Sequence, residues 1–285
     1  MTYFKSKKKR KAKNWPSSLL TIFLAILAIF WMIPFVFMIL TSLKSSGDIA
    51  QSPPWALPKV WEFHNFKDSW VRGDLKTVGF NSLIVVLIKV PLGLVISSLS
   101  AFALSRLKLR RSSFVLGVFV IGAMIPIQIG LGPLFGMIND LNLLNTRLGL
   151  ILPYLAFGIP TQTFMFYNFF KSVPMELDEA ANIDGAGAWR LYWNIITPIS
   201  KPVFGALFIL DFVATWNEFA MASTLMQDQK MYLIPQAIQN FNTQYVTSWG
   251  QVNAFVISTM LPVLVMYLIF QRFFTSGALS GAVKG

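Results

Sequence analysis

The 285-residue sequence contains no cysteine and a single histidine, His64. Without cysteine the chain forms no disulfide, carries no thiol nucleophile and offers no thiolate to a metal. One imidazole is too few for a metal site, which takes three or four ligands, so we expect a structural role for His64 and no bound metal. Charge is scarce as well: 13% of the residues are charged, whereas soluble domains carry about 25%.

The sequence also lacks the motif GxxxxGK[ST], whose backbone amides hold the phosphates of a bound nucleotide. It contains no pair of carboxylates placed with a nucleophile in a soluble domain. We therefore expect no catalytic residue and no cofactor in this chain. Energy for an active process must then come from another subunit.

Apolar residues are abundant, since 55% of the chain is hydrophobic and the mean hydropathy is +0.59. Several apolar runs approach 20 residues, the length of a helix that crosses a bilayer. The pattern predicts an all-α integral membrane protein with six transmembrane helices, roughly at residues 19–40, 81–104, 114–138, 148–170, 203–225 and 252–274. The third run contains Pro126, Gly130 and Pro133, so we expect a kinked or broken helix there.

The net charge of +12 is concentrated beside the apolar runs. Seven of the 24 basic residues lie in residues 5–13 and four lie in residues 106–111. Such clusters are typical of cytoplasmic segments and argue against nucleic-acid binding. We expect both termini in the cytoplasm, with a basic tail at 1–17, the transmembrane domain at 18–274, a second tail at 275–285 and an external loop at 42–78.

One polar segment, residues 172–202, separates the fourth and fifth apolar runs, and this topology places it in the cytoplasm. Ser172 can cap a helix whose first turn contains Pro174. The segment holds four of the twelve acidic residues of the chain: Glu176, Asp178, Glu179 and Asp184.

The first helix of this segment has a face of small side chains bordered by carboxylates, with members at helical spacing: Leu177, Ala180, Ala181 and Asp184. Gly185 should end this helix. A second amphipathic helix at 187–196 should bury three side chains: Trp189, either Leu191 or Tyr192, and Ile195. The pattern fits a surface helix pair and a docking site for a partner equally well.

Polar side chains also occur inside the expected spans. Asp211, Thr215 and Glu218 follow i, i+4, i+7 and so share one stripe of the fifth helix. Further candidates accompany them: Lys89, Trp216, Asn217 and Asn253. Such groups can bind a solute along a pathway, or they can hold helices together, with Lys89 pairing with Asp211. We favour helix packing.

The order Glu179-Ala180-Ala181, then Gly185, Ile195 and Pro198, resembles the EAA loop of ABC importer permeases, although Thr197 stands where that family usually has leucine. The resemblance covers nearly the whole chain and is nearest to the second permease of maltose-type transporters. It includes TSLK at 41–44, FNSLIV at 80–85, AFALSRLKLR at 101–110, MIPIQ at 124–128, WNEF at 216–219 and the terminal GAVKG. It implies the type I ABC importer permease fold.

In this family the EAA loop is the coupling helix, which fits a cleft on the ATPase subunit. The resemblance thus implies coupling roles for Leu177, Glu179, Ala180, Ala181, Asp184 and Gly185. It also implies a second homologous permease in a heterodimer, two cytoplasmic ATPases that bind ATP and Mg, and an extracytoplasmic solute-binding protein. The expected substrate is a sugar, with an oligosaccharide favoured, and the expected location is the bacterial cytoplasmic membrane.

Three other functions stay open from the sequence. The first is an ABC permease for a solute other than a sugar. The second is an ion-coupled secondary transporter with a relay of Asp211, Glu218 and Lys89, which six spans without an inverted repeat disfavour. The third is a membrane scaffold that uses residues 172–202 only for docking.

Overall fold

The computed structural model describes residues 17–107, 109–242 and 247–282, and within them the side chains from Leu19 to Phe273. The expected basic tail lies outside the described residues apart from Ser17, and so do the last three residues of GAVKG. Throughout the described ranges the chain is helical; they contain no strand, only an isolated bridge between Asn242 and Thr247.

Four helices are long and apolar enough to cross a membrane: α1 (Ser17–Ser42), α4 (Leu75–Arg106), α7 (Arg147–Ser172) and α14 (Trp249–Ala282). They coincide with the first, second, fourth and sixth apolar runs. Helix α14 continues past residue 274, where we expected the C-terminal tail to begin.

The third and fifth apolar runs belong to two pairs of helices that are each joined at a sharp bend. Helices α5 (Ser112–Ala123) and α6 (Ile127–Asp140) meet at 93° on either side of Pro126, which confirms the broken third helix. Helix α9 (Ala188–Leu191), the π-helical turn η1 (Tyr192–Ile196) and α10 (Thr197–Ile199) together meet α11 (Lys201–Trp216) at 74°. The described residues thus hold four candidate spans, or up to six if each bent pair is one span.

The fifth run is shorter than expected, because α11 ends at Trp216 and a separate helix, α12 (Ala220–Leu225), follows. The carboxylate of Glu218 accepts hydrogen bonds from the backbone amides of Met221 and Ala222, at 2.8 and 3.0 Å. These bonds satisfy N–H groups that the first turn of a helix leaves free, so they stabilise a new helix start. The expectation of one uninterrupted helix over 203–225 was therefore wrong.

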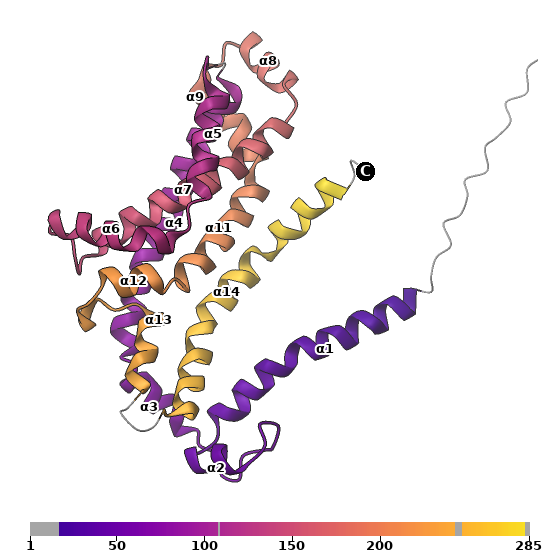
Figure 1. Cartoon of the computed structure of the whole chain (residues 1–285). Coiled ribbons are helices and arrows are strands. Elements are labelled where there is room, and N and C mark those ends of the chain that lie inside the picture. The colour runs from indigo at the N-terminus through magenta and orange to yellow at the C-terminus, as the bar shows by residue number, and fades with distance from the viewer. Residues whose placement is uncertain (1–16, 108, 243–246, 283–285) are drawn as a thin grey trace, which may run out of the picture.

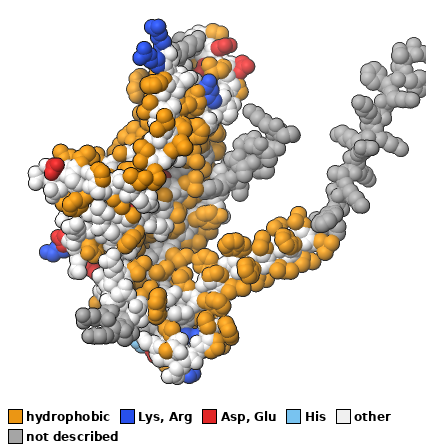
Figure 2. All heavy atoms as spheres, in the orientation of Figure 1, with side chains coloured by type: hydrophobic (Ala, Val, Ile, Leu, Met, Phe, Trp, Pro, Cys, Tyr) orange, Lys and Arg blue, Asp and Glu red, His pale blue; other side chains and the backbone are white. Residues whose placement is uncertain are grey.

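The short helices lie between the long ones: α2 (Ser46–Gln51), α3 (His64–Arg72), α8 (Glu176–Ile183), η2 (Gln229–Met231), α13 (Ile234–Ala237) and η3 (Ile238–Phe241). Figure 1 shows α8 and α9 at one end of the elongated molecule and α2 and α3 at the opposite end. In Figure 2 charged side chains are visible at the end with α8 and α9, at the end with α2 and along the edge beside α6, and hydrophobic side chains cover most of the surface between them. This distribution suits a bundle whose middle lies in lipid.

The core forms where α4 packs along α7 and where α11 packs against both α4 and α14. One buried cluster contains Phe102, Phe166, Phe170, Tyr192 and Phe212, and a second surrounds Ile138, Leu150 and Met221 near α6, α7 and α12. Helix α1 is different: it contacts α14, yet its side chains are exposed along most of its length and it diverges from the bundle in Figure 1. A helix that is apolar all round needs lipid or another protein against it.

Candidate functional site

Helix α8 carries most of the candidate coupling residues. It begins at Glu176 after Met175, and no side chain caps it. Ser172 belongs instead to the last turn of α7, where its hydroxyl donates to the Phe169 carbonyl at 2.7 Å. The expected Ser172 cap was therefore wrong: α7 extends through Ser172, and Pro174 forces Val173 into an extended conformation that separates the two helices.

The four residues expected on one face of α8 do not share one environment. Only Asp178 and Ala181 of this helix are buried. Ala181 packs into the first core cluster, whereas three expected companions are exposed: Leu177, Ala180 and Asp184. The buried line of α8 runs through Asp178 and Ala181, so Ala181 lies at the inner border of the expected face and its other three members lie on the exposed part. The exposed side also carries Glu179 and Ile183, the latter 87% exposed.

Gly185 ends α8, as predicted. Its φ of +73° lies in the left-handed region, which glycine adopts without a Cβ clash. The Gly185 amide donates to the Asn182 carbonyl and the Ala186 amide donates to the Ala181 carbonyl, at 3.1 and 2.9 Å. This pair of bonds is the Schellman arrangement, which satisfies carbonyls that the last helical turn leaves free.

The second helix of the loop is more irregular than expected, since α9 leads directly into η1. Leu191, Tyr192 and Ile196 are buried, and the Tyr192 hydroxyl lies 2.7 Å from Ser98 Oγ of α4. Trp189 is 67% exposed, so its expected burial was wrong. A π-helical turn adds a residue to the helical repeat, which rotates the residues after it relative to the even spacing assumed from the sequence.

One buried ion pair of this loop is not predicted by the sequence pattern. The Arg106 guanidinium donates to both Asp178 carboxylate oxygens, at 3.1 and 3.2 Å. Asp178 was counted among the carboxylates available to a partner, but its contacts lie within the chain. Arg106 directly follows an apolar run, which is a weak sign of a buried arginine. Nothing in the spacing connects two residues so far apart in sequence.

A second buried ion pair lies within the bundle. Lys89 of α4 donates to Asp211 Oδ1 and to Thr215 Oγ1 of α11, the latter at 3.2 Å. The expected Lys89–Asp211 pairing is confirmed. Asp211 Oδ2 is also buried, but it has no hydrogen-bond partner.

Glu218 and the other polar candidates make separate contacts. Glu218 accepts a 2.6 Å hydrogen bond from the Tyr154 hydroxyl, in addition to capping α12. Trp216 Nε1 donates to the Thr259 carbonyl of α14 at 3.2 Å. Asn217 is exposed and Asn253 is half-buried, and each donates to the backbone carbonyl four residues earlier in the chain. Tyr154 was not singled out from the sequence, because an aromatic residue in an apolar run gives no sign of its partner.

Two adjoining hollows follow this polar region. One, of about 190 Å³, is lined in part by Lys89, Tyr154, Asp211, Thr215 and Glu218. The other, of about 250 Å³, is lined in part by Thr161, Gln162 and Met165. They share Gly158, Asp211 and Ala214, so Asp211 of the ion pair borders both hollows and Lys89 borders the smaller one.

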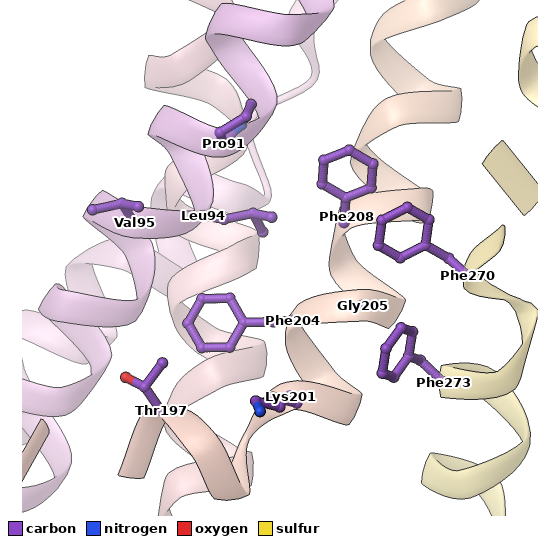
Figure 3. A pocket seen from close by; sticks show the side chains of 10 residues that line it. All are labelled: Pro91, Leu94, Val95, Thr197, Lys201, Phe204, Gly205, Phe208, Phe270 and Phe273. Carbon is purple, nitrogen blue, oxygen red and sulfur yellow. The ribbon is translucent and has the colours of Figure 1, made fainter. Parts of the chain in front are cut away.

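A third cavity, of about 350 Å³, has a different chemical character. Figure 3 shows aromatic rings of Phe204 and Phe208 from α11 and of Phe270 and Phe273 from α14 facing a space bounded by α4. Its polar lining is limited to Thr197 and Lys201. Since a hydrated solute would lose hydrogen bonds to water here without replacing them, this cavity is unsuited to a polyhydroxylated ligand.

Metal binding finds no support among the described residues, where no group of three potential ligands occurs. His64 Nδ1 lies 3.0 Å from a Glu62 carboxylate oxygen, and its Nε2 lies 3.9 Å from Asp68. These contacts hold the start of α3 near the preceding turn, in agreement with a structural role for His64.

Known proteins that resemble this chain indicate its family. Residues 90–276 match the family model described as "Binding-protein-dependent transport system inner membrane component". The chain is 34% identical over 242 residues to the "Diacetylchitobiose uptake system permease protein NgcG" of Streptomyces coelicolor, with 84% of this chain and 80% of that protein covered. It is 32% identical to the "Melibiose/raffinose/stachyose import permease protein MelC" of Bacillus subtilis, with 97% and 100% covered.

A solved structure has the same fold. It is a chain of a bacterial ABC transporter "involved in the import of the acidic polysaccharide alginate", with a TM-score of 0.77 and 20% identity. The similarity covers 94% of this chain and 100% of that one. The match therefore includes both bent pairs of helices, although at this identity it informs only about the fold.

Proposed function

The chain belongs to the family of binding-protein-dependent transport system inner membrane components, and we propose that it is the membrane-spanning permease subunit of an ATP-driven sugar importer, with an oligosaccharide as substrate. The family match over residues 90–276 carries this proposal, because that range includes α8 and the two bent pairs. The sugar class rests on relatives named for diacetylchitobiose, for melibiose, raffinose and stachyose, and for trehalose.

In the proposed topology each bent pair counts as one of six spans within residues 18–274. Both termini and α8 then lie in the cytoplasm, and α2 and α3 lie outside the cell. Two features support this arrangement: α8 and α2 occupy opposite ends of the molecule, and the basic residue Arg106 lies at the end of α4 that contacts α8. The membrane is the cytoplasmic membrane of a bacterium.

The exposed side of α8 is the proposed contact with an ATPase. Glu179, Ala180 and Asp184 present small and acidic groups, and Leu177 adds an apolar contact. Alanine allows close approach of another backbone, and carboxylates suit arginine side chains. Ala181 acts from the inside by seating α8 on the bundle, and Gly185 sets the direction in which the chain leaves it.

The partners follow from this role. Two cytoplasmic ATPases supply ATP and Mg chemistry, a second homologous permease completes the pathway as a heterodimer, and an extracytoplasmic protein delivers the sugar. Along the pathway, Asp211 borders both adjoining hollows and Lys89 and Thr215 border the smaller one, so a hydroxyl of the substrate can approach them. Their direct bonds to each other support helix packing as their first task.

The test is uptake of labelled sugars by vesicles that contain the whole importer. We expect this chain to co-purify with an ATPase. We also expect uptake to require ATP and the solute-binding protein and to be inhibited by vanadate. Uptake that persists without ATP and follows an ion gradient would instead support a secondary transporter. If the importer takes up only a non-sugar solute in an ATP-dependent manner, the permease role stands and the sugar assignment is refuted.

A further inference from the structure

We propose that Arg106 is a positioning residue that fastens α8 to α4, so that both helices move as one body when the ATPase displaces α8. This inference rests on the proposed function, because it names the route by which a movement of α8 reaches the spans. Neither the EAA pattern nor the chain connections of α8 require such a link, since α8 is joined in sequence to α7 and α9 and not to α4.

The contacts of Arg106 join three helices. Arg106 is the last residue of α4, and its side chain is fully buried. One terminal nitrogen donates to both carboxylate oxygens of Asp178 in the first turn of α8. The other donates to the carbonyls of Phe170 and Val173 at the C-terminal end of α7, the latter at 2.7 Å. A cation at that position is also stabilised by the negative end of the α7 dipole.

Helix α8 depends on this pair for its position. A helix of eight residues is too short to be stable alone, so contacts with the bundle must hold it. Its only buried residues are Asp178 and Ala181. Among the described residues, Arg106–Asp178 is also the only ion pair of α8. A paired guanidinium and carboxylate in a buried site is strongly directional, so it resists both sliding and rotation of α8.

Helix α4 can carry the movement into the membrane. Arg106 and Lys89 lie on the same continuous helix, about 25 Å apart at 1.5 Å per residue. Lys89 is in turn paired with Asp211 of α11. Helix α4 is thus fixed at its cytoplasmic end to α8 and farther along to α11. This route runs parallel to the covalent connection through α9, η1 and α10.

The functional test uses the assembled importer in proteoliposomes, with Arg106→Gln, Asp178→Asn and Arg106→Lys. We expect sugar transported per ATP hydrolysed to fall about tenfold in the first two variants while ATP hydrolysis continues, which is the loss of coupling between two sites. Lysine keeps the charge but not the forked donor geometry, so Arg106→Lys should be intermediate. Arg110→Gln, in the same basic loop but exposed, is the control and should equal the parent.

A purely structural role would lower assembly, hydrolysis and uptake together and leave the ratio unchanged. That result in both Arg106→Gln and Asp178→Asn would overturn the proposal. Asp178→Asn keeps the shape of the side chain, so it serves as the second variant if Arg106→Gln fails to fold.

A distance measurement tests the rigid link directly. Because the chain has no cysteine, Asn182→Cys on α8 and Leu107→Cys after α4 provide two exposed sites for spin labels in an importer whose other subunits also lack cysteine. We expect the same distance in the nucleotide-free and vanadate-trapped states, and different distances once Arg106→Gln is added. A distance that changes in the parent chain during normal uptake would refute the link while leaving the permease function intact.

Discussion

Lys89 and Arg106 each bring a positive charge into the packed interior from the same helix, and each is matched by one aspartate. The loss of hydration is costly for both ions, so the value of each pair lies in keeping the other charge satisfied. Removing one partner leaves an unpaired charge buried, whereas replacing both partners by apolar residues leaves no buried charge and so avoids that cost in free energy. A comparison of single and double variants therefore separates the effect of each ion pair on stability from its effect on transport.

We predict that Lys89→Met destabilises the chain by about 3 kcal/mol, because it leaves Asp211 unpaired in the bundle. The double variant Lys89→Met/Asp211→Leu should recover most of this loss. The thermal unfolding midpoint of the purified importer in detergent measures both effects. Lys76→Met, at an exposed site on the same helix, should leave the midpoint unchanged. A double variant less stable than Lys89→Met would show that the pair does more than satisfy two charges.

Asp48 in α2 provides a pH-dependent prediction. The hydrogen bond from the Ser52 hydroxyl, and then that from the Lys59 amide, lower the pKa of the Asp48 carboxyl below its ordinary value. A lowered pKa in the folded state stabilises the fold above the ordinary aspartate pKa, and this contribution disappears as the pH falls through the lowered pKa.

Asp48→Asn should therefore lower the unfolding midpoint at pH 7, and the difference from the parent should shrink as the pH falls below about 4. Unfolding scans across this pH range provide the measurement, with the exposed Asp140→Asn as control. A difference that stays constant down to the lowest pH would mean that the charge of Asp48 contributes nothing.

Among the helices, α8 is limited in length by the bonds at its C-terminal end and held in position by contacts with the bundle. The Schellman bonds at Gly185 stop the helix, and the left-handed φ of Gly185 turns the chain towards α9. Gly187, two residues later, has a φ of −73° that any residue can adopt. No atom lies within 4 Å of a Cβ placed at either glycine, so the two sites differ in backbone conformation and not in space.

We predict that Gly185→Ala costs about 1 kcal/mol, because a side chain is strained in the left-handed region. Displacement of the loop should then reduce ATP-dependent sugar uptake, and Gly185→Pro should abolish it while the chain still inserts. Asparagine tolerates this conformation, so Gly185→Asn should retain more uptake than Gly185→Ala. Uptake per inserted copy is the measurement. Equal activity of Gly185→Ala and the control Gly187→Ala would contradict the assigned role of the turn.

The molecule as a whole is an elongated bundle from which α1 diverges, and hydrophobic side chains cover most of its visible surface. The exposed apolar surface of α1 implies contact with lipid or with another protein. The opposite ends carry the loops that the proposed topology places on opposite sides of the membrane.

This topology predicts opposite labelling of two single-cysteine variants. Ile183→Cys in α8 and Trp55→Cys in the α2–α3 segment replace strongly exposed residues of a chain without cysteine. A membrane-impermeant maleimide should modify Trp55→Cys in spheroplasts and Ile183→Cys only in inverted vesicles. Ile26→Cys in α1, which the bilayer or a partner should cover, serves as the unlabelled control. Labelling of both sites from the same side would rule out the proposed topology.

Features that depend on neighbouring residues could be predicted from the sequence. Apolar runs located the candidate spans, Pro126 located the break in the third run, and Gly185 marked the end of α8, because length, ring geometry and backbone freedom act locally. The Lys89–Asp211 pair was also predictable, since an intramembrane charge needs an opposite charge and the chain offers few.

Only the tertiary structure decided which polar residues meet. It turned Asp178 inwards to Arg106 and left Leu177 and Ala180 exposed, and it used Glu218 to start a new helix where the apolar run alone predicted continuation. It likewise left Trp189 of α9 exposed. The physical reason is common to all of these. Burial and pairing depend on which helices pack together, and the pattern within one helix contains no information about a partner that lies far along the chain.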